Sequence, residues 1–368
     1  MKVRIVCYEE VDAWILGKFA RRLNENLRLQ GVDVDIAKTP DPSADINHHI
    51  IYFDYDGRKT TTETVMITHI DTDWKLDRVR QQVIEAEMGV CMSADTLQQL
   101  VRKGVPRHKL CYINPAHDDW VRPRKKLIGI TSKVQPSGCK REEMLLELAG
   151  RIAADDFKFF IMGGGWSSIV DSLRKLGIEV DHYDRFDDQA YRQILPSLDY
   201  FLYFGQDEGS MGFLDALSAG IPTIVTPQGF HLDAINGITH PFNDLRELVK
   251  IFADIAAPAH RLRHSVEDWT WSEYARKHLV LWDYLLRRKT SQPVLMSHLK
   301  ELQAMSVAQQ PEVLAGLKAG VLYGINKTSR IPRSMRRRLS SGAQKVYLLL
   351  YKIKRRTARI IPHSRTHS

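Results

Sequence analysis

Strand-like and helix-like segments alternate along residues 1–260 of this 368-residue chain. The apolar run at 3–7 precedes a segment in which Ile15, Phe19, Leu23 and Leu27 recur every four residues, which indicates a helix ended by Gly31. Further strands are expected at 32–36, 50–53, 65–69, 90–92, 110–113, 127–130, 157–162, 179–182, 200–204 and 223–225. This alternation predicts an α/β protein with parallel sheets covered by helices.

The length predicts two domains, each large enough for its own core. The simplest architecture is two Rossmann-like halves facing a cleft, with ligands at the carboxyl ends of the strands. We predict an N-terminal domain at 1–116, a second domain at 117–264 and a long helical segment at 265–289. A helical and then basic tail would occupy 290–368.

The composition is ordinary for a soluble protein, with 43% apolar and 26% charged residues. The first residues resemble a strand rather than a signal peptide, and no apolar run approaches the roughly 20 residues that span a bilayer. The four cysteines, Cys7, Cys91, Cys111 and Cys139, are scattered and form no CxxC pair. We therefore expect a cytoplasmic protein with reduced, mostly buried cysteines.

The net charge of +9 comes from one end of the chain. Residues 318–368 hold fourteen of the 53 basic residues and no acidic ones, which leaves 39 basic against 44 acidic residues before them. A basic segment with interspersed apolar residues suits the surface of an anionic membrane. The alternatives are a disordered, solvated tail and, more remotely, a nucleic-acid-binding segment; the acidic remainder offers no recognised module for reading nucleic acid.

The segment 207–222 carries the clearest chemical signal. Two acidic residues, Asp207 and Glu208, precede Gly209-Ser210-Met211-Gly212, which opens a short helix carrying Asp215. A helix that begins this way directs free N–H groups and the positive end of its dipole at a phosphate. Carboxylates on both sides suit hydroxyl-rich ligands, so the segment predicts a site for a sugar nucleotide.

With these residues in view, the chain resembles the retaining GT-B glycosyltransferases of family 4 over roughly 1–287. The similar features are the eight-residue spacing of Asp207 and Asp215 followed by Ala216 to Pro222, the stretch 130–134 with Lys140, the glycine-rich turn at 161–165, the stretch 114–118, and the helix that begins near Trp269 and Trp271. Aspartates stand where the family has glutamates, and Lys133 stands where it has an arginine. Glu9 to Asp12 replace the family's N-terminal Gly-Gly loop.

The resemblance implies sugar transfer from a nucleotide diphosphate sugar, with retention of configuration and without a metal or other cofactor. Lys133, Lys140 and the N–H groups of Ser210 to Gly212 would bind the diphosphate, beside the turn at Gly163 and Gly164. Asp207 or Glu208 would bind the donor sugar, and Asp215 the ribose. The helix at 265–289 would cross back to the N-terminal domain.

Four residues of the N-terminal domain are candidates for the acceptor side. His69 and Asp71 follow an expected strand, and the resemblance implies a histidine at such a position near the acceptor. His48 and His49 are adjacent, but no third ligand is suitably spaced for a metal site. We therefore expect a contact with the acceptor for them instead.

Together these features predict a glycosyltransferase that uses a glycan or lipid-linked acceptor. We expect a role in surface polysaccharide biosynthesis and a peripheral position on the membrane's inner face. One rival is a catalytically inactive GT-B-like scaffold that binds sugar nucleotides. A second is an epimerase-like enzyme on the same architecture.

Overall fold

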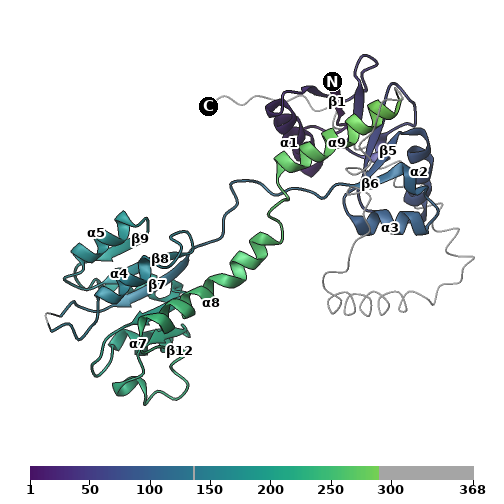
Figure 1. Ribbon diagram of the computed structural model, residues 1–368. Coiled ribbons are helices and arrows are strands. Elements are labelled where there is room, and N and C mark those ends of the chain that lie inside the picture. The colour runs from purple at the N-terminus through teal and green to yellow at the C-terminus, as the bar shows by residue number, and fades with distance from the viewer. Residues whose placement is uncertain (136, 290–368) are drawn as a thin grey trace, which may run out of the picture. The chain divides into compact units, whose positions relative to one another are not determined.

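The computed structural model describes residues 1–135 and 137–289 (Figure 1). The expected tail at 290–368, with its predicted helix at 295–305 and its basic segment at 318–368, lies outside the described residues. Within the described residues, none of the helices has both the length and the apolar character needed to cross a membrane.

The N-terminal domain is built on a parallel six-stranded sheet with the order β2-β1-β3-β4-β5-β6. Its strands are β1 (Lys2–Val6), β2 (Asp33–Ala37), β3 (Ile46–His49), β4 (Glu63–Ile67), β5 (Met88–Cys91) and β6 (Leu110–Tyr112). The helices are α1 (Ile15–Leu29), α2 (Asp73–Glu85), α3 (Ala94–Arg102) and α9 (Trp271–Lys289), with short 3-10 turns at Tyr52–Asp54 and Arg107–Lys109.

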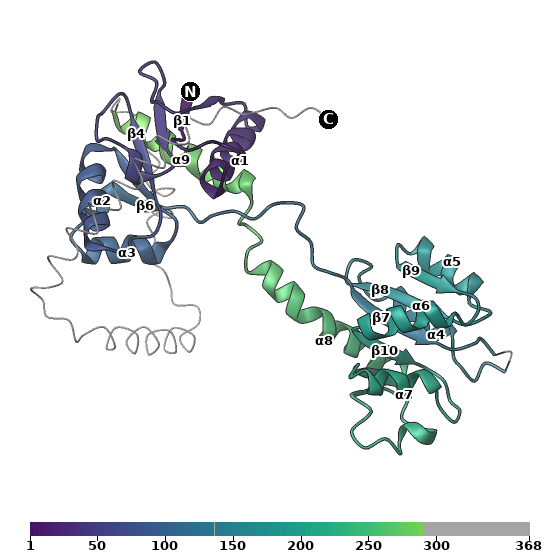
Figure 2. The same ribbon diagram turned by 180° about the vertical axis from the view of Figure 1, so that it is seen from behind.

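Helices cover both faces of this sheet. Successive residues of a strand point to opposite faces, so one strand contributes side chains to the core on each side. Met66 of β4 belongs to the core formed with α1 and α9, which includes Phe19 and Trp282. Its neighbours Val65 and Ile67 belong to the opposite core, formed with α2 and α3. Figure 2 shows these two pairs of helices on either side of the strands.

The C-terminal domain repeats this plan with the order β12-β11-β10-β7-β8-β9, again all parallel. Its strands are β7 (Lys126–Thr131), β8 (Phe157–Met162), β9 (Glu179–Tyr183), β10 (Tyr200–Tyr203), β11 (Thr223–Val225) and β12 (His240–Pro241). The helices are α4 (Glu143–Ala149), α5 (Ser167–Lys175), α6 (Asp188–Ile194), α7 (Met211–Ser218) and α8 (Leu245–His264), with 3-10 turns at Leu195–Ser197 and Gly229–His231. One core packs this sheet against α4, α5 and α8, and a second core packs its other face against α6 and α7.

Two Rossmann-like domains confirm the predicted α/β class and the two-domain plan that the GT-B resemblance implies. The expected strand at 50–53 is wrong: β3 lies at Ile46–His49, and Tyr52–Asp54 forms a 3-10 turn. Three of the four residues of β3, Asn47, His48 and His49, are polar, so the sequence does not indicate a buried strand here. In the structure all four residues are buried. As expected, Cys7, Cys91 and Cys111 are buried, and all four cysteines are free.

Each sheet has one point at which the strand order reverses. In the N-terminal sheet, β2 and β3 lie on opposite sides of β1; in the C-terminal sheet, β8 and β10 lie on opposite sides of β7. At such a point the loops leaving two neighbouring strands diverge to opposite faces and leave a crevice at the carboxyl edge, the usual ligand position in open α/β sheets. Topology therefore directs attention to the loops after β1 and β3 and to those after β7 and β10.

The segment that follows β6 and the segment that precedes α9 are held together next to α1. His117 pairs with Thr270 in a parallel bridge. The adjacent Asp118 accepts hydrogen bonds from Lys18 Nζ at 2.6 Å and from Trp271 Nε1 at 3.0 Å. One carboxylate thus ties the start of α9 to α1.

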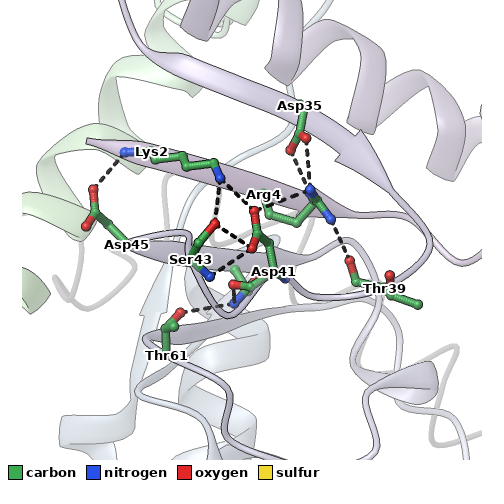
Figure 3. A network of polar contacts seen from close by, with 9 residues as sticks. Lys2, Arg4, Asp35, Thr39, Asp41, Ser43, Asp45 and Thr61 are labelled. Atoms are coloured by element: carbon green, nitrogen blue, oxygen red, sulfur yellow. Dashed lines mark hydrogen bonds and ion pairs between the residues drawn. The ribbon is translucent and has the colours of Figure 1, made fainter.

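A polar network fixes the loop between β2 and β3 (Figure 3). Arg4 binds both carboxylate oxygens of Asp35, at 2.6 and 2.9 Å. Lys2 Nζ contacts Asp41 at 2.8 Å, and Asp41 accepts from the N–H and hydroxyl of Ser43. Asn47 Oδ1 accepts the Asp41 N–H at 2.8 Å, which joins this network to buried β3.

Candidate functional site

The N-terminus of α7 is packed against the carboxyl end of β7, at the reversal point of the C-terminal sheet. Ser210, the N-cap residue, donates from Oγ to the Thr131 carbonyl at 3.4 Å. A Cβ added at Gly212 would overlap Thr131 Oγ1 and lie 2.8 Å from Phe201. Only glycine therefore allows this close approach, which accounts for one of the glycines in the 209–212 motif.

The turn after β8 lies against the segment that follows β7. Gly163 has a φ of +147°, and a Cβ there would overlap the Ser132 carbonyl. The Val134 N–H donates to the Gly164 carbonyl at 3.0 Å. Lys133 lies between these two contacts and is exposed. The structure therefore brings the predicted residues Gly163, Gly164 and Lys133 together.

Lys140, which follows β7, and Asp207, which follows β10, form an ion pair. Lys140 Nζ also donates to the Tyr203 hydroxyl, which in turn donates to Asp207 Oδ1 at 2.5 Å. Burial alone would raise the pKa of Asp207, but the hydrogen bonds from Lys140, Tyr203 and Gly209 lower it overall. Burial and the bond to Asp207 raise the pKa of Tyr203. Lys140 and Asp207, expected in separate roles, are thus paired, and an anion that binds Lys140 must compete with this carboxylate.

His231 is a site residue that the sequence analysis missed. It is fully buried, and its Nε2 accepts the Ser210 N–H at 3.0 Å, while Nδ1 faces the Thr226 carbonyl at 3.3 Å. These partners require the neutral tautomer with the proton on Nδ1, and burial lowers the pKa of His231. The expectation for the N–H of Ser210 is therefore wrong: it is already bonded. Met211 and Gly212 keep the first N–H groups of α7, which have no intrahelical acceptor.

Two glycines allow the close approaches around this histidine and the loop before α7. Gly209 has a φ of +119°, and a Cβ there would lie 2.8 Å from His231 Nε2. A Cβ at Gly229 would overlap the Glu208 carbonyl. The loop after β10 therefore interlocks with the loop after β11.

Arg141, next to Lys140, holds the loops behind the site. It donates to the Phe204 carbonyl at 2.7 Å, the Thr226 hydroxyl at 2.6 Å and the Asn243 carbonyl at 3.1 Å. Burial lowers the pKa of this guanidinium. Its partners follow β10, β11 and β12, so the group fixes three strand ends.

The remaining acidic candidates are exposed. Glu208 precedes Gly209 on the solvent side, whereas the Asp207 carboxylate is engaged with Lys140. Asp215 lies in α7 and accepts a hydrogen bond from Tyr191 at 2.8 Å. Burial, followed by this bond, raises the pKa of Tyr191. Of the two neighbouring acids, Glu208 is the more accessible to a ligand.

On the N-terminal domain, His69 and Asp71 lie together after β4. Lys75 of α2 contacts Asp71 at 2.8 Å and His69 Nε2 at 3.2 Å. Both candidate side chains are largely exposed, at 75% and 56%. This polar group is open to a ligand at the carboxyl edge of the sheet.

His48 and His49 do not reach the surface, which argues against the expected contact with an acceptor. Both are fully buried in β3. His48 packs against His278 and Trp282 of α9, with ring centroids at 4.9 and 5.7 Å. His49 lies on the other face of the sheet and bonds Glu63 at 2.6 Å. Within 1–135 and 137–289, no group of three His, Cys, Asp or Glu residues is arranged to hold a metal ion.

No protein-family model matches the sequence, and no curated protein matches it significantly. Among solved structures, the chain is similar to the lipopolysaccharide outer core galactosyltransferase WaaB in its apo form, at 13% identity over 78% of this chain and 100% of that chain, with a TM-score of 0.31. A glycosyltransferase from Rickettsia africae matches at 11% identity over 78% and 98%, with a TM-score of 0.32. Anabaena Alr3699/HepE in complex with UDP and glucose matches at 12% identity over 79% and 98%, with a TM-score of 0.30. These structural neighbours are glycosyltransferases, but at such low TM-scores the two parallel sheets remain the basis of the fold assignment.

Proposed function

We propose that the chain is a glycosyltransferase that moves a sugar from a nucleotide diphosphate sugar to a glycan or lipid-linked acceptor. One observation carries the proposal: an α7 N-terminus, a glycine turn and Lys140 converge where the strand order of the C-terminal sheet reverses. This combination supplies N–H donors, backbone space and positive charge at one edge, which is what a diphosphate requires.

In this reaction the bond between sugar C1 and the diphosphate breaks, and negative charge grows on the leaving phosphate. Lys133, Lys140 and the N–H groups of Met211 and Gly212 would stabilise that charge without a metal. Glu208 would bind the donor sugar hydroxyls, and Asp215 the ribose. The diphosphate would displace Asp207 from Lys140 or share the ammonium with it.

The finer parts of the proposal concern the chemistry and the setting. It includes retention of configuration, a place in surface polysaccharide biosynthesis, and attachment of residues 318–368 to the inner face of a membrane. A lipid-linked acceptor would be consistent with such attachment.

The test is a panel of nucleotide sugars, beginning with UDP-glucose, assayed for nucleotide release and for protection from heat unfolding. We expect one donor class to raise the Tm and to release nucleotide when acceptors are added, with or without EDTA. If no nucleotide or nucleotide sugar stabilises the protein, the proposal is wrong.

One observation favours a second candidate, a sugar-nucleotide-binding scaffold without catalysis: the Lys140 charge is already neutralised by Asp207. The scaffold would be stabilised by the same nucleotides but would give no turnover with any acceptor. The panel separates the two candidates, because it measures binding and nucleotide release on the same samples.

A further inference from the structure

Tyr8 and His49 meet at the reversal point of the N-terminal sheet. Tyr8 comes two residues after the end of β1, and His49 is the last residue of β3. Val6 of β1 is paired with His49 in the parallel register. Both residues therefore lie at the carboxyl edge, where the loops after β1 and β3 diverge.

A row of hydrogen bonds connects this edge to a buried carboxylate. The Tyr8 hydroxyl lies 3.0 Å from His49 Nδ1, and His49 Nε2 lies 2.6 Å from Glu63 Oε2. A carboxylate accepts, so the imidazole proton belongs on Nε2, and Nδ1 is left to accept from the Tyr8 hydroxyl. Glu63 thus sets the tautomer of His49, so that Tyr8 donates to His49 and His49 donates to Glu63.

Glu63 is held in its ionised form. Its Oε1 accepts from Asn47 Nδ2 at 3.1 Å and from the N–H groups of Thr60 and Thr61 at 3.0 and 2.9 Å. Burial alone would raise the pKa of Glu63, but the bonds from His49 and these N–H groups lower it overall. Asn47 is itself fixed by the Asp41 N–H, which donates to its Oδ1 at 2.8 Å. The negative charge is therefore rigidly placed beside His49.

The row leads from the interior to the surface. Glu63 and His49 are fully buried, whereas Tyr8 is partly exposed. The buried carboxylate holds the imidazole in place, so His49 Nδ1 offers the Tyr8 hydroxyl a fixed hydrogen-bond acceptor. His48 provides the contrast on the other face, because its nearest ring partners are His278 and Trp282 and its Nε2 has no hydrogen-bond partner among the described residues.

We propose that Tyr8 is a catalytic residue that takes the proton of the acceptor hydroxyl, with His49 and Glu63 as positioning residues behind it. This inference rests on the proposed glycosyl transfer. As the acceptor oxygen bonds to C1 of the donor sugar, its proton passes to Tyr8 Oη, and the Tyr8 proton passes to His49 Nδ1. The C1–phosphate bond breaks with its electron pair going to the leaving phosphate. The imidazolium, stabilised by Glu63, later returns the proton to solvent through Tyr8.

The test compares Tyr8→Phe with Tyr112→Phe, a control at the end of β6 in the same sheet. With the donor and acceptor found in the panel, we expect Tyr8→Phe to lower kcat about 100-fold or more, with KM values and stabilisation by UDP nearly unchanged. Tyr112→Phe should keep kcat within about threefold of the wild type, because Tyr112 lies outside the row. A purely structural role for Tyr8 predicts a lower Tm and no selective loss of kcat.

A spectroscopic measurement tests the row itself. In protein labelled with ¹⁵N-histidine, we expect one imidazole with its proton on Nε2 whose Nδ1 signal moves toward that of a free nitrogen in Tyr8→Phe and stays in place in Tyr112→Phe. If Tyr8→Phe transfers sugar at the wild-type kcat, or if no imidazole signal moves, this inference is wrong while the proposed function stands. If no donor supports transfer, the proposed function fails and this inference fails with it.

Discussion

The backbone N–H of Ser210 donates to Nε2 of the buried His231 at 3.0 Å. This bond joins the first residue of the α7 cap to the loop after β11, across 21 positions of sequence. Because the histidine takes up the N–H of the cap residue, the groups that remain to bind an anion are those of Met211 and Gly212. The position of α7 therefore depends on a side chain that a ligand need not touch.

Replacing His231 with phenylalanine removes this acceptor. We expect the buried Ser210 N–H to be left unsatisfied, which lowers the free energy of unfolding by about 1–3 kcal/mol. Urea unfolding followed by circular dichroism measures the change. His264→Phe is the control, because that side chain is 84% exposed, and it should have little effect. Equal stability of His231→Phe and the wild type would contradict the assigned bond.

The protein should lose stability in mild acid through the histidines between β3 and α9. Burial lowers the pKa of His278 to about 4 and that of His48 below its usual value. Below about pH 6.5 the unfolded chain then binds more protons than the folded one, so His278 lowers the free energy of unfolding by about 2 kcal/mol between pH 7 and 5. His48 acts in the same direction. Urea unfolding at both pH values should show a smaller pH effect in His278→Phe. An unchanged pH effect in that variant would count against this assignment.

Gly212→Ala should displace α7. The added Cβ would overlap Thr131 Oγ1 and approach Phe201, so we expect a cost of about 1–3 kcal/mol and weaker stabilisation by UDP. Gly150→Ala is the matched control, because a Cβ there meets nothing closer than 3.7 Å. Thermal unfolding with and without UDP measures both effects. If Gly212→Ala is as stable as Gly150→Ala and is stabilised equally by UDP, the close approach of α7 to Thr131 does not constrain residue 212.

Lys140→Met should weaken nucleotide binding. A charge-assisted contact to phosphate would be lost, and we expect the Kd for UDP to rise at least about 10-fold in isothermal titration calorimetry. Lys158→Met removes a lysine from the same sheet that pairs with Glu179 and Asp181 instead, so UDP affinity should be kept. Equal losses in the two variants would mean that Lys140 has no specific role in binding.

The basic segment can be tested on the full chain with lipid vesicles. We expect binding to vesicles containing phosphatidylglycerol, little binding to pure phosphatidylcholine, and weaker binding as salt rises. Changing Arg336, Arg337 and Arg338 together to glutamine should cost about 1 kcal/mol per residue in a sedimentation assay. Binding that is equal on both lipids and insensitive to salt would exclude electrostatic attachment.

Periodic patterns and glycines were the predictable part of this molecule. The four-residue spacing at 15–27 and the apolar run at 157–162 reflect local packing, and both elements form where expected. Gly209 and Gly212 likewise marked the start of α7, because close approach and positive φ leave few alternatives to glycine.

Long-range pairing could not be predicted in this way. The bonds from Lys140 to Asp207 and from Ser210 to His231 span 67 and 21 residues, and neither has a local spacing that would reveal it. The strand at Ile46–His49 was not predicted for a related reason. Its polar side chains form hydrogen bonds with partners such as Thr64 and Glu63, so they are buried although they are polar.

The cysteines give the chain a natural attachment point for a reporter. Burial raises the pKa of the thiols of Cys7, Cys91 and Cys111, whereas Cys139 is partly exposed and adjoins Lys140. A maleimide dye on the unmodified protein should therefore attach at this one position, within a residue of the proposed phosphate contact. Donor occupancy could then be followed by fluorescence without engineering the protein.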